Sequence, residues 1–148
     1  MQVADGVYSI AAIGISGASL IVVRIADGLI FGNDSSGARY EGAIADAGPG
    51  EVNISFSATF APKTFGIWGI SPSETFQTRN FDVVVPAGLF SREPYELPEY
   101  GMTVLGTRIP DERGWLADVT GFADHIFNLI EVQQAWQGYD RQKSEPPA

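Results

Sequence analysis

One histidine and a few carboxylates are the residues of this chain that could carry out acid–base chemistry. His125 would act as a general base only beside a nucleophile in a cleft, and its position near the start of a predicted helix favours the surface. Asp111 and Glu112 fall at a predicted hairpin tip, whereas Asp82 and Asp118 are single acids within predicted strands. We therefore expect no catalytic residues and a protein that is not an enzyme.

Metal and cofactor chemistry is restricted in the same way. The chain has no cysteine, which excludes disulfides, thiolate zinc sites and iron–sulfur clusters. Its acidic residues do not show the spacing of a calcium-binding EF-hand loop. Its glycines lack the spacing of a phosphate-binding or dinucleotide-binding loop and are typical of turns. We expect neither a bound metal nor a cofactor.

An acidic segment, Arg92–Gly101, has a glutamate at every third position. Its two prolines favour a polyproline II helix with three residues per turn, which would align the three carboxylates along one edge. The apolar residues between them would add aromatic anchors to this charge, as in a protein-docking surface. A solvated loop is the alternative interpretation. The predicted partner-binding residues are Glu93, Glu96, Glu99, Tyr95 and Tyr100.

An apolar segment, Phe65–Ile70, lies between Pro62 and Pro72. Exposed aromatic surface of this density favours association, so the segment predicts a dimer interface or the mouth of a pocket. The alternative is a short strand or lid that folds back and completes the core. The residues concerned are Phe65, Ile67, Trp68 and Ile70. Because two-fold dimers are the commonest assemblies, we expect a homodimer.

Strand patterns occupy most of the chain. Glu51–Phe60 alternates apolar and polar residues, which is typical of an antiparallel strand with one buried face. Ala26, Asp27 and Gly28 carry a strong hairpin signal, because Asp-Gly tolerates the positive φ of tight turns. The other predicted strands are Val7–Ile13, Ser19–Ile25, Leu29–Gly32, Arg39–Ala45, Phe76–Val85, Met102–Ile109 and Trp115–Val119.

Short connections between these strands, without crossover helices, predict an all-β fold. We expect a lipocalin-like antiparallel barrel of about eight strands. Toward the C-terminus the apolar period changes to that of a helix, and Asp124–Trp136 is predicted as one amphipathic helix that packs on the barrel or closes its end. Residues 1–140 would then form a single domain, followed by a flexible tail over residues 141–148.

Composition limits the partners of this domain. The 148 residues carry a formal net charge of −9, which disfavours nucleic acid and favours a basic protein partner. Val7–Val23 resembles a membrane segment, but glycine and serine interrupt it and no basic residue precedes it, so two strands explain it better. We expect no membrane association. The absence of cysteine is compatible with a reducing cytoplasm.

Four stretches of the chain, in this order and spacing, resemble the GrlR-like family of negative regulators of type III secretion. They span roughly residues 5 to 110 and are Asp5–Ile10 (DGVYSI), Asp27–Asp34 (DGLIFGND), Tyr40–Gly42 (YEG) and Phe81–Pro86 (FDVVVP). The resemblance implies a lipocalin-like barrel in a cytoplasmic, dimeric bacterial regulator. It also implies action by binding another protein. From the acidic surface we expect a basic partner, such as a transcription regulator. The turn Asp46–Glu51 departs from the family's acidic run, with an acid only at each end.

A second function is compatible with the same fold. A barrel of eight strands can enclose one small ligand, so the protein could carry a small apolar molecule. The aromatic residues available to line such a site are Phe56, Phe60, Phe65, Trp68 and Phe76. The volume of the barrel interior separates a carrier from a barrel that its own side chains fill.

Overall fold

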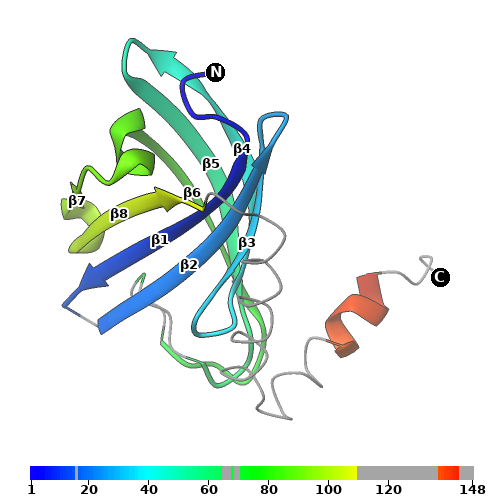
Figure 1. Ribbon diagram of the computed structural model, residues 1–148. Coiled ribbons are helices and arrows are strands. Elements are labelled where there is room, and N and C mark those ends of the chain that lie inside the picture. Colours follow the sequence, from blue (N-terminus) through cyan, green and yellow to red (C-terminus); the bar gives the residue numbers. More distant parts are fainter. Residues whose placement is uncertain (16, 65–67, 69–70, 110–136, 144–148) are drawn as a thin grey trace.

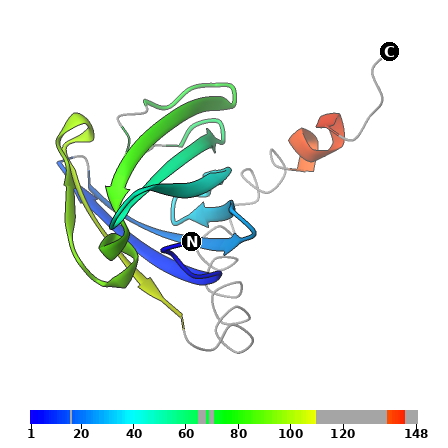
Figure 2. The same ribbon diagram turned by 90° about the horizontal axis from the view of Figure 1, so that it is seen from above.

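The computed structural model describes residues 1–15, 17–64, 68, 71–109 and 137–143. Within these residues, one eight-stranded antiparallel sheet rolls into a nearly closed barrel (Figures 1 and 2). The strand order is β6-β5-β4-β3-β2-β1-β8-β7, so β6 and β7 are the two ends of the rolled sheet. The elements are β1 (Gly6–Gly14), β2 (Gly17–Ala26), β3 (Leu29–Asp34), β4 (Arg39–Gly48), β5 (Glu51–Phe60), β6 (Gln77–Pro86), the 3₁₀ helix η1 (Ala87–Ser91), β7 (Tyr95–Leu97), the 3₁₀ helix η2 (Pro98–Tyr100) and β8 (Met102–Arg108).

The predicted fold class, an antiparallel barrel with a C-terminal helix, is confirmed. Residues 137–143 are helical. Arg39 at the start of β4 donates two hydrogen bonds to the Asp140 carboxylate, at 2.7 and 3.2 Å, and Nζ of Lys143 lies 3.8 Å from Oε1 of Glu41. These contacts place the helical segment beside β4. The predicted helix range, Asp124–Trp136, lies outside the described residues, and residues 141–143 of the predicted tail belong to the helical segment.

Alternation of side chains decides which face of each strand is buried. Along β5, Val52 and Ala58 are fully buried and Ile54 and Phe56 pack on the core. The predicted strand range for β5 matches the structure, and the other predicted strands in the described part of the chain differ from the observed ones by a few residues. The predicted strand Trp115–Val119 lies outside the described residues.

The predicted hairpin between β2 and β3 is present. Ala26 pairs with Leu29, which leaves a two-residue turn of Asp27 and Gly28 with φ of 51° and 77°. Positive φ at both positions is the geometry of a type I′ turn, whose twist matches that of the flanking strands.

Two glycines on the inner face allow the sheet to curve around the interior. A Cβ on Gly42 of β4 would collide with the Ser55 carbonyl and with Phe56, and a Cβ on Gly32 of β3 would collide with the Val22 carbonyl. Glycine in a strand interior marks a place where backbones approach closely, as at the bend of a barrel. The strands can therefore close over a core that includes Val7, Tyr8, Ile21, Val23, Ile25, Ile44, Val52, Phe60, Val85 and Phe90.

The acidic segment does not form the predicted polyproline II helix. Tyr95–Leu97 is instead β7, paired with β8 from Tyr95↔Val104 to Leu97↔Met102, and Pro98–Tyr100 is the 3₁₀ helix η2. The physical reason is the neighbouring edge of β8. Backbone pairing with β8 supplies hydrogen bonds that a polyproline II helix lacks.

Candidate functional site

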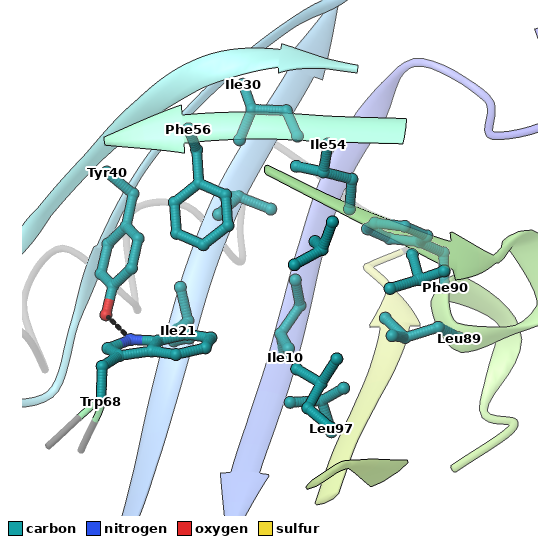
Figure 3. A pocket seen from close by; sticks show the side chains of 14 residues that line it. Ile10, Ile21, Ile30, Tyr40, Ile54, Phe56, Trp68, Leu89, Phe90 and Leu97 are labelled. Atoms are coloured by element: carbon teal, nitrogen blue, oxygen red, sulfur yellow. Dashed lines mark hydrogen bonds between the residues drawn. The ribbon is translucent and has the colours of Figure 1, made fainter. Parts of the chain in front are cut away.

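The interior of the barrel contains an apolar cavity of about 80 Å³. Fourteen side chains of the described residues line it (Figure 3), and they come from all eight strands, η1 and Trp68. Aliphatic residues form most of the wall, among them Ile10, Ile21, Ile30, Ile54 and Leu97. Small-molecule sites are typically several times larger, about 300–1,000 Å³. Most of the barrel interior is therefore filled by the protein's own side chains.

Trp68 fills one end of this interior. Its side chain is buried, with a relative exposure of 9%, and among the described residues it contacts three other rings. The ring centroids of Phe81, Tyr100 and Phe56 lie 5.0, 5.4 and 5.9 Å from that of the indole. Phe81 and Tyr100 also contact each other at 5.4 Å, which links β6 to the end of η2. The aromatic cluster thus ties together the two ends of the rolled sheet.

A hydrogen-bonded chain of three side chains holds the indole. The Trp68 Nε1–H donates to the Tyr40 hydroxyl at 2.9 Å (Figure 3). The same hydroxyl donates to Oδ2 of Asp34 at 2.6 Å. Asp34 is at the end of β3 and Tyr40 near the start of β4, so the β3–β4 turn positions both of them.

Asp34 is a carboxylate in the protein interior, with a relative exposure of 2%. Its Oδ1 accepts hydrogen bonds from the backbone N–H groups of Ser36 and Ala38 and from the Ser36 hydroxyl, at 2.6–3.0 Å. Together with the Tyr40 phenol, these donors compensate for the loss of water around the carboxylate. Burial, followed by the adjacent Asp34 carboxylate, raises the pKa of Tyr40, so the phenol keeps its proton.

The hydrogen bonds among Asp34, Tyr40 and Trp68 orient an indole, and none of the three side chains is a nucleophile activated by another. Asp34 fixes the direction of the phenol O–H, and the phenol oxygen then faces the indole N–H of Trp68. Because the hydroxyl proton of Tyr40 is directed to Asp34, its oxygen is left to accept from Trp68. Asp34 and Tyr40 therefore help to fix the position of the indole in the barrel.

The acidic segment presents its carboxylates to solvent and its rings to the core. Glu93, Glu96 and Glu99 are exposed, and the Glu93 carboxylate also lies against Gly88 of η1. Tyr95 and Tyr100 are partly buried and pack against the core cluster. In β7 the side chain of Glu96 therefore lies on the opposite side from its neighbours. The result is an acidic rim on a backbone that β8 and the aromatic cluster hold in place.

Trp68 is the one residue of the predicted dimer or pocket surface that the structure describes. Trp68 lies inside the barrel, so its indole is part of the pocket and is not available to a dimer interface. Phe65, Ile67 and Ile70 lie outside the described residues. The homodimer stays a prediction.

Other candidate residues take structural positions. Asp82 faces outward and accepts hydrogen bonds from Asn53 and Ser55, at 2.7 and 3.2 Å. Phe60 is fully buried, and Phe76 packs on Tyr139 at 4.9 Å. His125, Asp111, Glu112 and Asp118 lie outside the described residues.

Asp34 and Tyr40 were not among the sequence-predicted site residues. A turn follows Asp34 in the structure, but a polar turn alone does not indicate that its aspartate is 2% exposed and bonded to a buried phenol. One signal in the sequence was available. Asp34 lies four residues after Ile30, so alternation along the strand places it on the same buried face.

Searches of known protein families, of characterised proteins and of solved structures found no match to this chain. Within the described ranges, no group of three or more metal-ligating side chains occurs. None of the helices in that part of the chain is long and apolar enough to cross a membrane.

Proposed function

We propose that this chain is a non-enzymatic regulatory protein that binds a basic partner protein through its acidic segment. The observation that carries the proposal is the exposure of Glu93, Glu96 and Glu99 within seven residues of one another. The net charge of −9 adds a long-range attraction for a basic partner.

Rigid support makes this rim suitable for recognition. Tyr95 pairs with Val104, and Tyr100 contacts both Trp68 and Phe81. Because the backbone is held, a partner pays little conformational entropy to order it. The resemblance to GrlR-like regulators, which implies a cytoplasmic bacterial protein that acts by binding another protein, supports the same function. A transcription regulator is the partner that we propose.

A pull-down from the source cells tests the proposal. The baits are wild type, the triple variant Glu93→Gln, Glu96→Gln, Glu99→Gln, and a control with Asp27→Asn, Glu51→Gln, Glu74→Gln, whose residues are exposed elsewhere. Both variants remove three negative charges. We expect wild type and control to retain the same basic protein and the acidic-segment variant to lose it. Equal retention by all three baits would contradict the proposal.

The barrel cavity favours a second candidate, a carrier of a small apolar ligand. The wall is apolar, but the volume of about 80 Å³ is several times below that of a typical small-molecule site, about 300–1,000 Å³. Native mass spectrometry of the protein purified from its source cells tests this candidate. A bound small molecule together with no protein partner would support the carrier and contradict the regulator.

A further inference from the structure

The two ends of the rolled sheet have different free edges. Directly after β6, the Ala87 N–H donates to the Gly50 carbonyl at 2.8 Å, and this bond fixes which residues of β6 direct their backbone groups to β5. Residues of an antiparallel strand alternately direct their backbone groups to one side and the other. The backbone N–H and C=O groups of Phe81, Val83 and Val85 therefore point toward β5. The backbone groups that point away from β5 belong to Thr78, Asn80, Asp82 and Val84.

These backbone groups of β6 form a long open edge. Among the described residues, β6 pairs only with β5, and the backbone groups of the four outward-directed residues have no hydrogen bond to another described residue. Val84 adds an exposed β-branched side chain, 48% accessible, beside this edge. An open edge of this length is a template for an additional strand.

The edge of β7 is short and protected. The bond from the Arg92 N–H to the Gly106 carbonyl, at 2.8 Å, shows that even-numbered residues of β8 face β7. The backbone groups of Tyr95 and Leu97 consequently point toward β8. Of the three residues of β7, only Glu96 directs its backbone groups to the free edge. The residues on either side of β7 are prolines, which have no N–H to donate. A new strand would therefore pair with β6.

The surroundings of this edge select the chemistry of the incoming strand. Val83 and Val85 of β6 and Leu97 of β7 line the same apolar cavity, so inward side chains should be small and apolar. Asp82 and the acidic rim are exposed on the outer side, so outward side chains should be basic. Arg79, near the start of β6, would repel a basic side chain. The basic residues of the incoming strand should therefore lie beside the Asp82–Pro86 half of β6.

We propose that the seam between β6 and β7 accepts an extended segment of the basic partner as an additional strand paired with β6. This inference rests on the proposed function and specifies how the partner binds. Strand addition combines main-chain hydrogen bonds for affinity with alternating side chains for specificity.

A synthetic strand provides the first test. The probe is a labelled, end-capped decapeptide that alternates valine and lysine, and fluorescence anisotropy measures its binding to the full chain. The controls replace lysine with glutamate, or methylate every second backbone nitrogen. We expect each control to bind about tenfold more weakly or worse, because it loses charge complementarity or edge hydrogen bonds. Equal binding by the methylated peptide would overturn the inference.

Amide hydrogen exchange locates the bound peptide. Exchange at Thr78, Asn80, Asp82 and Val84 should slow when the valine–lysine peptide is added. Unchanged exchange at these four amides on saturation would overturn the inference. Protection without peptide that grows with protein concentration would also overturn it, because a second copy would then occupy the edge.

A proline substitution separates this inference from the proposed function. Asn80→Pro removes an N–H that points away from β5 and should leave the β5 pairing intact, and Asn80→Ala is the matched control. We expect the proline variant to bind the peptide about tenfold more weakly than the alanine variant. If a protein captured in the pull-down binds both variants equally, strand addition is wrong while the proposed function stands. The methylated peptide keeps the test valid if the proline variant does not fold.

Discussion

The indole N–H of Trp68 donates to the hydroxyl of Tyr40, 28 positions earlier in the chain, across the interior of the barrel. Tyr40 in turn donates to the buried Asp34, so a carboxylate at the end of β3 fixes an indole that reaches in from beyond β5. This relationship accounts for the small volume of the cavity. It also removes the indole from the outer surface, where we expected a dimer contact.

Substitution of Trp68 should therefore affect stability and leave the assembly state unchanged. Trp68→Ala should lower the free energy of unfolding by about 3–5 kcal/mol, because it removes a buried aromatic ring and leaves a cavity. Urea denaturation measures the loss, and light scattering reports the assembly state. A shift from dimer to monomer without a loss of stability would contradict the interior position of the ring.

The Asp34 carboxylate should stabilise the fold through its hydrogen bonds. Asp34→Asn replaces an acceptor-only group with an amide, whose NH₂ would face the N–H groups of Ser36 and Ala38 or the Tyr40 hydroxyl. We expect a loss of about 1–3 kcal/mol, as for buried polar groups that lose their partners. Asp82→Asn, at an exposed aspartate, is the control and should change stability little. Similar unfolding free energies for the two variants would count against the buried network.

Alkaline pH should destabilise the protein through Tyr40. Burial and the Asp34 carboxylate raise the pKa of this phenol in the folded state, whereas the unfolded phenol titrates near pH 10. The folded protein then retains a proton that the unfolded chain releases. This contribution to stability is complete below about pH 10 and falls above it, by up to about 1.4 kcal/mol per pH unit. Urea midpoints should fall more steeply above pH 10 for wild type than for Tyr40→Phe, and parallel curves would refute the assignment.

The bend of the barrel should depend on Gly42. A methyl group there would collide with the Ser55 carbonyl, so we expect Gly42→Ala to cost about 1–3 kcal/mol. Gly138→Ala is the control, because no atom apart from its chain neighbours and the backbone of its own helix lies within 4 Å of the added Cβ. The two thermal midpoints measure the difference. An unchanged midpoint for Gly42→Ala would show that the strands can shift without cost.

Local sequence patterns were sufficient to predict most of the barrel. Alternation in β5 and the Asp27-Gly28 turn are encoded within a few residues, so their ranges could be read directly. β7 could not be predicted in this way. It has only three residues between prolines, and its conformation depends on pairing with β8.

The candidate site was less accessible to prediction for the same physical reason. The exposed glutamates of the acidic segment follow from their charge, but the partial burial of Tyr95 and Tyr100 depends on long-range packing. The hydrogen bond from Trp68 to Tyr40 likewise spans 28 positions, so no local pattern around Asp34 and Tyr40 indicates it.

The association rate constant of the captured partner, measured over a range of salt concentrations, tests the central claim most directly. Stopped-flow measurements would compare wild type, the triple glutamine variant at Glu93, Glu96 and Glu99, and the control with three distant charges removed. Charge steering acts on association and is screened by salt. We predict that only the acidic-segment variant associates about tenfold more slowly at low salt and shows a flatter salt dependence. Identical rates and salt slopes for the two variants would contradict a specific role of the acidic segment.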